Sequence, residues 1–337
     1  MEALNNTSLA ENGTGMVPTG QPHMPPPFDI GTAMLANGIF LAIMSPTTII
    51  LNSLLLFAIF KDPFKTFQSP STYFLIGLTV TDLVSGLVVE PVVMTCYFMT
   101  YSQHPSTGDC MIVLTDHIGL LSAASINSSF LIVLSFTVVQ YLAVSWPLKY
   151  KNIVNVRRTI TCIIGIWIYT ILFELLQKIG VPKTVIENTD LILHTTISFI
   201  VMVVFYILLQ RSFHKKMKLG FVLRAESTIQ STSASIQADG NRRSPRNTPT
   251  NKQIDIEKKF IRVNLLLIAL LFFCSIPNAI MWYILLVEPQ YRNSTDFFIA
   301  RIIMDNTLWV KFLLDPLIYA WRLPKYRRAL KKSFQSH

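Results

Sequence analysis

The chain has 337 residues, of which 51% are hydrophobic and only 14% are charged, and its mean hydropathy is +0.45. Soluble domains carry about 25% charged residues, so this composition excludes an ordinary pair of soluble domains. The apolar residues come in long blocks bounded by charged residues, which also excludes a disordered chain, a coiled coil and a disulfide-bonded scaffold. We therefore expect a membrane protein.

Seven apolar stretches are long enough to cross a bilayer as helices, which takes about 20 residues each. None of them alternates strictly between polar and apolar residues, as the strands of a membrane barrel do. The sequence therefore predicts an all-α fold, a bundle of seven transmembrane helices. The expected spans cover approximately residues 30–60, 69–99, 113–144, 159–177, 191–210, 263–287 and 299–321.

The distribution of Lys and Arg predicts the orientation of these spans. If the N-terminus is outside, the inner segments hold 23 of the 29 Lys and Arg residues, as is typical of cytoplasmic loops. The net charge of +10 is therefore assigned to one side of a membrane and not to a nucleic-acid surface. Asn-x-Ser/Thr sequons agree with this orientation, since all but the one at Asn127, inside a span, fall outside. We expect glycosylation at Asn5, Asn6, Asn12 and Asn293.

The chain outside the spans divides into three segments. Residues 1–29 form an extracellular tail before the membrane domain of residues 30–321. Within that domain, residues 212–257 are expected to be a disordered third cytoplasmic loop, rich in Ser, Thr, Asn and Arg. Residues 322–337 combine apolar and basic residues in a pattern typical of an amphipathic helix on the inner membrane surface, followed by the C-terminal tail.

Short motifs follow one another along the spans in a fixed order. They are Asn52 in LNSLLLF, Asp82 in LTVTDLVSG, the run QYLAVSWPLKY, Trp167, Tyr206, Pro277 in CSIP, and Pro316 and Tyr319 in DPLIY. Together, over about residues 30–335, they resemble the rhodopsin-like (class A) G-protein-coupled receptors. The resemblance implies a multi-pass plasma-membrane receptor for an extracellular ligand. Its implied partners are a heterotrimeric G protein, arrestin and membrane lipids.

No motif for a nucleotide, a metal site or a nucleophile is present, so we expect no enzyme activity, no cofactor and no metal. No nucleic-acid partner is expected either. A proton-coupled transporter is a further reading, suggested by three charged residues in the spans, but the chain lacks the internal repeats of such proteins. These three residues are Asp82, Lys311 and Asp315.

The inner end of the third span departs from the family pattern. The usual Asp-Arg-Tyr is replaced by Val139, Gln140 and Tyr141. In the family this arginine contributes to the G-protein contact and pairs with an acid of the sixth span, a position that Glu257 matches. A neutral glutamine forms hydrogen bonds about half as strong. The alternative function is therefore a receptor-fold scaffold or decoy that engages arrestin-like or dimer partners with little G-protein turnover. The resemblance assigns activation and the G-protein interface to Gln140, Tyr141, Tyr206, Glu257, Pro277, Pro316 and Tyr319.

The cysteines depart from the pattern as well. The second outer loop contains no Cys, so the usual disulfide of the family is absent. Cys96 ends the second span and Cys110 precedes the third, both on the oxidising side of the membrane. A Cys96–Cys110 disulfide and two free thiols both remain open.

The sequence leaves the ligand unidentified. Amine receptors of the family carry an aspartate one turn into the third span, where this chain has Ser122, which disfavours a biogenic amine. The lysine of the retinal proteins is replaced by Trp309, and Lys311 lies about 200° further round the helix. Candidate ligand-binding residues in the outer halves of the spans, each with packing as the alternative role, are Glu90, Asp116, Ser122, Ser125, His194, Asn278, Trp282 and Trp309.

A polar cluster is expected in the middle of the bundle. Many members of the family bind a sodium ion there, on the acid of the second span, a serine of the third and polar residues of the seventh. The matching residues are Asp82, Ser129, Lys311 and Asp315. A lysine in mid-bilayer costs about 2.5–3.5 kcal/mol on insertion scales, so it should face the bundle and find a partner. We expect Lys311 to replace the sodium ion; the alternative is that it reaches towards water without contacting either acid.

Overall fold

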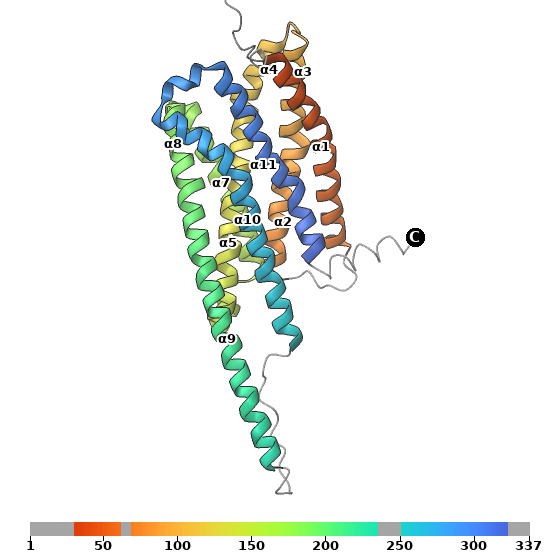
Figure 1. Cartoon of the computed structure of the whole chain (residues 1–337), viewed down its shortest axis with the longest axis vertical. Helices are drawn as coiled ribbons and strands as arrows, with labels where there is room; N and C mark the ends of the chain where they lie inside the picture. The colour runs from red at the N-terminus through yellow and green to blue at the C-terminus, as the bar shows by residue number, and fades with distance from the viewer. Residues whose placement is uncertain (1–29, 62–68, 235–250, 323–337) are drawn as a thin grey trace, which may run out of the picture.

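The computed structural model describes residues 30–61, 69–234 and 251–322, and every regular element in these ranges is a helix. Figure 1 shows the helices side by side in one elongated bundle. Six helical rods of the described chain are long and apolar enough to cross a membrane. A seventh rod, α11 (Thr295–Arg322), has a comparable length, and its charged residues Lys311 and Asp315 are buried within the bundle. The predicted seven-helix bundle is confirmed.

The second, third and fifth rods each contain one π-helical turn within otherwise α-helical chain. Such turns insert a residue and change which side chains face the bundle. The first four rods are α1 (Ile30–Phe60); α2 (Pro70–Val84), η1 (Ser85–Val89) and α3 (Glu90–Tyr101); α4 (Thr107–Val113), η2 (Leu114–Ile118) and α5 (Gly119–Ser145); and α7 (Val156–Leu175) with η3 (Leu176–Ile179).

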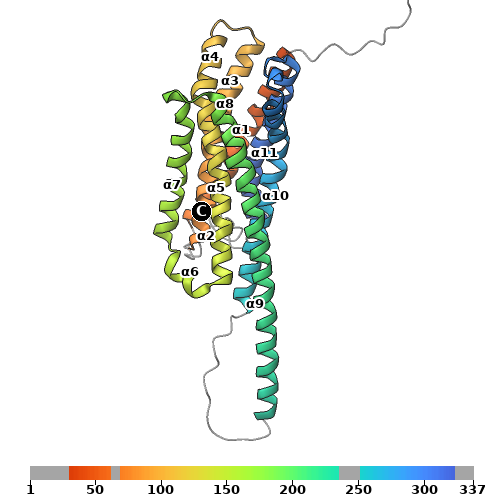
Figure 2. The same ribbon diagram turned by 90° about the vertical axis from the view of Figure 1, so that its left-hand side faces the viewer.

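In Figure 2, helix α9 of the fifth rod extends far beyond the inner end of the other helices. The fifth rod comprises α8 (Lys183–Thr189), η4 (Asp190–Ile197) and α9 (Ser198–Ala234), and the sixth is α10 (Asn251–Val287). Two short helices complete the described chain: α6 (Pro147–Ile153) at the inner end, beside α5, and η5 (Pro289–Asn293) at the outer end.

The predicted disordered loop over residues 212–257 is wrong at both of its ends. Helix α9 continues to Ala234, and helix α10 begins at Asn251. Extending a helix that already exists avoids the cost of nucleation, so polar residues of moderate helix propensity can join it. The predicted amphipathic helix over residues 322–337 lies, apart from Arg322, outside the described residues, as do Asn5, Asn6 and Asn12.

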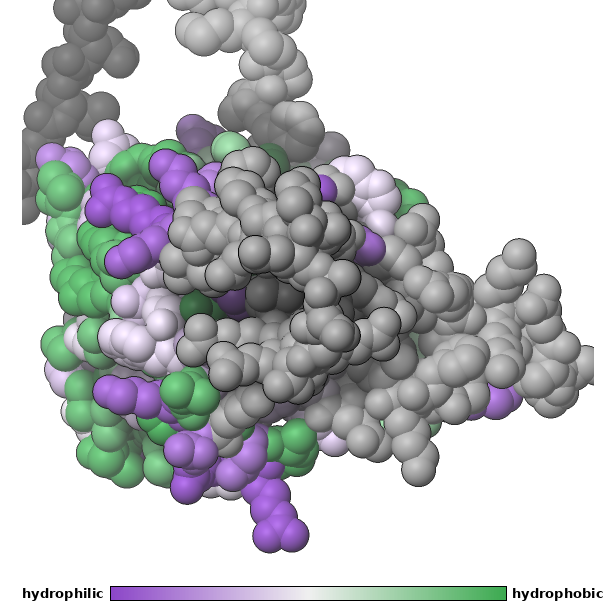
Figure 3. Space-filling model, turned by 90° about the horizontal axis from the view of Figure 1, so that it is seen from below, coloured by the Kyte–Doolittle hydropathy of each residue, from purple (hydrophilic) through white to green (hydrophobic). Residues whose placement is uncertain are grey.

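The sides of the bundle are apolar, whereas its inner end carries hydrophilic side chains. Large apolar residues such as Ile43, Ile168 and Ile200 are exposed on different helices, as expected where lipid is the solvent. Figure 3 views the inner end and shows hydrophilic residues around its rim. The largest apolar cluster of the interior includes Phe136 and Leu271.

Two prolines free backbone carbonyls that neighbouring helices satisfy. Pro316 has no N–H, so the carbonyl of Phe312 in α11 loses its helical partner. The side-chain amide of Asn52 in α1 donates to this carbonyl at 3.0 Å. In the second rod, the hydroxyl of Ser45 donates to the carbonyl of Gly86, five residues before Pro91, at 2.9 Å. These bonds fix α1 against both rods.

Candidate functional site: an outer cavity above a buried ion cluster

A cavity of about 350 Å³ opens among the helices in the half of the bundle that contains α8 and η5. Much of its lining consists of apolar and aromatic side chains, including those of Tyr97, Ile126, Phe130 and Trp309. Two π-helical segments, η2 and η4, supply further wall residues, including Thr115 and Asp190. By the Lys and Arg distribution this is the outer half, so the cavity faces the extracellular side.

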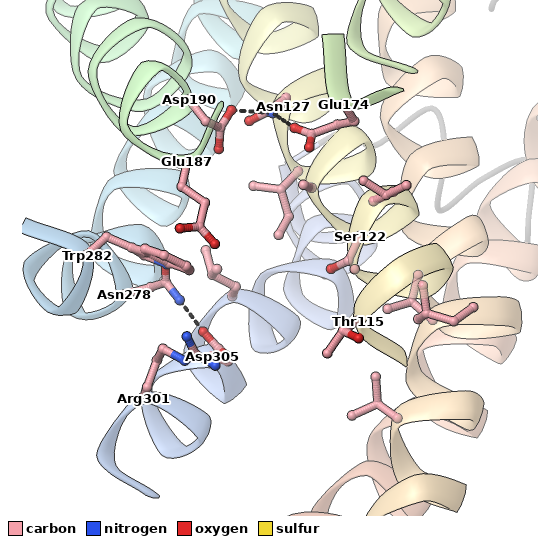
Figure 4. A pocket seen from close by; sticks show the side chains of 18 of the residues that line it. Thr115, Ser122, Asn127, Glu174, Glu187, Asp190, Asn278, Trp282, Arg301 and Asp305 are labelled. Carbon is pink, nitrogen blue, oxygen red and sulfur yellow. Dashed lines mark hydrogen bonds between the residues drawn. The ribbon is translucent and has the colours of Figure 1, made fainter. Parts of the chain in front are cut away.

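One wall of the cavity carries two carboxylates bound to the same amide (Figure 4). The amide nitrogen of Asn127 in α5 donates to Glu174 Oε1 at 3.2 Å and to Asp190 Oδ1 at 2.5 Å. His194 Nδ1 lies 2.8 Å from the same oxygen of Asp190, and its Nε2 lies 2.9 Å from the hydroxyl of Tyr169. This network joins α5, α7 and η4. It also holds Asn127 at 1% exposure, which excludes use of that sequon.

The facing wall is built from α10 and α11. Asn278 donates a hydrogen bond to Asp305, and the guanidinium of Arg301 lies over the rings of Trp282 and Phe298, 5.4 and 5.6 Å from their centroids. Figure 4 shows Glu187 between the two walls. Its carboxylate is paired with Arg292 at 2.8 Å.

Beneath the cavity, Lys311 forms a buried ion cluster. Its ammonium lies 2.7 Å from Asp315 Oδ2, 3.6 Å from Asp82 Oδ1 and 3.4 Å from Ser129 Oγ. The lysine is 3% exposed, and the other three residues are at most 1% exposed. The four residues of the predicted mid-bundle polar cluster are therefore in contact, and they join α11 to α2 and α5. Lys311 does not reach towards water.

Comparison with known families matches residues 51–319 to the family described as 7 transmembrane receptor (rhodopsin family). The chain belongs to the rhodopsin family of seven-transmembrane receptors. It is accordingly a multi-pass protein of the plasma membrane, and the members of this family are receptors.

Four of the predicted ligand-binding residues of this rhodopsin-family receptor line the outer cavity: Ser122, Asn278, Trp282 and Trp309. Ser125 lies elsewhere and bonds to Ser85 in the second rod at 3.0 Å. Asp116 is exposed and pairs with Lys178 at 3.4 Å. Glu90 is fully buried, and among the described residues neither of its carboxylate oxygens has a hydrogen-bond partner. His194 is buried behind Asp190.

Sequence reasoning missed the wall residues Asn127, Glu174, Glu187 and Asp190. One signal was available for Glu174, since it is an acid inside an apolar span, as Glu90 is. The other acids lie at the expected edge of the fifth span, where an acidic residue is ordinary. Only the π-helical turn of η4 and the contact with α5 show that Asp190 faces the cavity.

The outer end of the receptor is fixed by a disulfide between Cys96 and Cys110, whose Cα atoms lie 5.5 Å apart. The sequence left a disulfide and two free thiols open, and the structure contains the disulfide. It joins α3 to α4 near one edge of the bundle. Asn293 lies in the same outer half, is exposed and ends η5, so its sequon is accessible.

At the inner end, Gln140 is 5% exposed in α5 and Tyr319 is fully buried in α11. Tyr141 packs edge-on against Trp146 and Phe205, and Tyr206 accepts a hydrogen bond from Gln210. Pro277 and Pro316 lie inside α10 and α11. The side chain of Glu257 lies outside the described residues. One polar contact between α5 and α10 here joins Thr137 Oγ1 to Asn264 Oδ1, at 3.1 Å.

Proposed function

We propose that this protein is a G-protein-coupled receptor in which a ligand bound in the outer cavity changes helix packing at the inner end, where a heterotrimeric G protein binds. The observation that carries the proposal is the course of α11. Trp309 lines the cavity, and two residues further on Lys311 joins the ion cluster. A ligand that moves Trp309 therefore acts directly on a helix whose inner half is held by buried charges.

A signal of this kind needs two states of the bundle with different affinities for the ligand. Pro316 lies one residue beyond Asp315 and interrupts the backbone bonding of α11 at that point. Asn52 holds the freed carbonyl of Phe312 in the described state. Pro277 interrupts the backbone bonding of α10, and close to it the hydroxyl of Thr307 in α11 donates to the carbonyl of Cys274 at 2.8 Å. These sites supply the hinges that a change of packing requires.

The alternative is a receptor-fold scaffold that engages arrestin-like or dimer partners with little G-protein turnover. Gln140 favours it, because a neutral side chain stands where the family has its arginine. We place G-protein coupling first because the cavity, the ion cluster and both proline sites are connected through α10 and α11. These features serve transmission through the bundle and are not required of a passive scaffold.

Nucleotide exchange on cell membranes tests the proposal. Membranes from cells that express the receptor are assayed with a panel of purified G proteins, without and with candidate ligands, and untransfected membranes serve as the control. Coupling predicts exchange above the control with at least one G protein. Arrestin recruitment or receptor association, without exchange on any G protein of the panel, supports the scaffold instead.

A further inference from the structure

We infer that the ligand of the outer cavity is a small organic cation whose ammonium or guanidinium group binds between Glu174 and Asp190. The inference rests on the proposed function and names the ligand class of its binding site. The cation would be held by α7 and η4 and not by the third span, where Ser122 is neutral.

The two carboxylates lie close together; Glu174 is buried, and the side chain of Asp190 is 26% exposed. Both accept from the single amide nitrogen of Asn127, so the accepting oxygens of Glu174 and Asp190 are within about 6 Å of each other. Two carboxylates at this separation, one of them buried, are stable when one retains a proton or when a cation lies between them. Asn127 supplies only a neutral amide.

Among the described residues, the only basic side chain paired with either carboxylate is His194, whose Nδ1 lies 2.8 Å from Asp190 Oδ1. The Nε2 atom of His194 lies 2.9 Å from the hydroxyl of Tyr169, so this ring bridges Asp190 and Tyr169. No Lys or Arg of the described chain forms an ion pair with Glu174 or Asp190. Lys183 lines the cavity, but it is exposed, so water solvates its ammonium.

Glu174 offers a free acceptor to the cavity. The residue is only 5% exposed, yet it lines the cavity, and its Oε2 accepts no hydrogen bond from the described residues. A carboxylate oxygen that is open to the cavity is available to hydrogen-bond a group of the ligand. The other acids of the lining have partners already, since Glu187 pairs with Arg292 and Asp305 accepts from Asn278.

The rest of the cavity limits the size and character of the ligand. A volume of about 350 Å³ lies at the small end of the range of ligand sites, about 300–1,000 Å³. Beyond the carboxylates, the lining is mainly apolar, with Tyr97, Ile126 and Trp309 among its members. These walls fit a compact aliphatic or aromatic body attached to the cationic group.

The test uses the purified full-length receptor in detergent and a defined probe panel. The panel contains small primary amines and guanidines with aliphatic or aryl bodies, each paired with its neutral alcohol or urea analogue. Binding is read from the shift in melting temperature over a concentration series. We expect at least one cation to bind, and its neutral analogue to bind at least about tenfold more weakly, because the charge-assisted hydrogen bonds are lost.

Two isosteric variants locate the bound charge. Glu174→Gln and Asp190→Asn should each lower the affinity of the receptor for the cation at least about tenfold. Asp116→Asn is the matched control, since it removes one carboxylate from the same outer half but outside the cavity lining. The affinity of this control variant for the cation should stay within about twofold of the wild-type value, because water and salt screen an exposed charge. The melting temperature without probe reports folding, and Asp190→Asn carries the test where Glu174→Gln gives little folded protein.

The inference is contradicted if no cation of the panel binds. It is also contradicted if the affinity for the bound cation is unchanged in both variants, or if the neutral analogue binds equally tightly. The proposed function is judged by a separate readout. Cation binding that the variants weaken, without nucleotide exchange on any G protein, supports the inference and contradicts the proposed function. Exchange stimulated only by neutral or anionic ligands supports the function and contradicts the inference.

Discussion

The ammonium of Lys311 lies 2.7 Å from Oδ2 of Asp315, one turn further along the same helix. Asp82 faces it from α2 at 3.6 Å, so one buried cation stands between two buried carboxylates. Removing one partner of a buried ion pair costs about 3–5 kcal/mol, because the remaining charge is left uncompensated. The ion cluster therefore makes specific predictions for stability.

We predict that Lys311→Ala lowers the melting temperature of the purified receptor by several degrees. The variant leaves Asp82 and Asp315 facing each other without a cation, and one of them must take up a proton. In an Asp82→Asn, Asp315→Asn background, the same substitution should cost much less, because no charge is stranded. Lys311→Met controls for lost packing. Equal losses in both backgrounds would contradict the contact described here.

Sodium dependence follows from the same cluster. A tethered ammonium occupies the place where many relatives hold a sodium ion, so the melting temperature should be nearly the same in sodium and in a bulky inert cation. Lys311→Asn removes the ammonium and should create sodium dependence. The measurement is the melting temperature of both proteins in the two salts at equal ionic strength. If sodium raised the melting temperature of the wild type as much as that of Lys311→Asn, the Lys311 ammonium would not take the place of a sodium ion.

The ion cluster could be predicted from sequence because an unpaired lysine is costly in the middle of a membrane, so Lys311 must find an acidic partner. Lys311 and Asp315 are separated by four residues, so they share a helix face whatever the rest of the fold does. Placing Asp82 opposite them required the resemblance to the family, whose members hold a sodium ion on the matching acid of the second span. The seven helices follow equally directly from the apolar blocks.

The acidic wall of the cavity was not predictable in the same way. Whether Asp190 faces the bundle or lipid depends on the π-helical turn of η4, which breaks the 3.6-residue repeat on which a sequence argument relies. Glu174 reaches the cavity only because Asn127 lies opposite on α5. The inner length of α9 was missed for a related reason, since composition does not reveal that an established helix continues.

Loss of the contact between Thr137 and Asn264 should raise basal signalling. The hydroxyl of Thr137 lies 3.1 Å from Asn264 Oδ1 in α10 and 2.8 Å from the carbonyl of Val133 in its own helix, so one proton is shared between two acceptors. Both Thr137 and Asn264 are fully buried, and their contact joins α5 to α10 near the inner end. A neutral hydrogen bond is worth about 0.5–1.5 kcal/mol, so Thr137→Val should increase basal nucleotide exchange by roughly two- to tenfold. Thr79→Val is the control, because the Thr79 hydroxyl bonds only to its own helix, at Leu75. Equal effects of the two variants would argue against a role of the interhelical bond.

Gln140→Arg should change signalling at unchanged surface expression. The substitution restores the residue that relatives use at the inner end of the third span, and it offers Glu257 a charged partner. A charge-assisted hydrogen bond is roughly twice as strong as a neutral one, so basal exchange should fall, stimulated exchange should rise, or both. Exchange is measured on membranes with matched receptor numbers. No change in either quantity would show that the family role does not transfer to this position.

Glu90 provides a final comparison, because it lies in the same rod as Asp82 but in a different environment. Both acids are fully buried. Asp82 has Lys311 at 3.6 Å, whereas neither carboxylate oxygen of Glu90 has a hydrogen-bond partner among the described residues. A buried polar group without a partner costs about 1–3 kcal/mol, so Glu90 does not stabilise the described state.

Glu90→Gln, which keeps the volume, should leave the melting temperature unchanged or raise it, while Asp82→Asn should lower it because Lys311 loses one of its two carboxylates. Measuring both acid-to-amide variants side by side controls for the general effect of neutralising a buried acid. A loss for Glu90→Gln as large as that for Asp82→Asn would mean that the Glu90 carboxyl stabilises the folded receptor through a contact absent from the described residues.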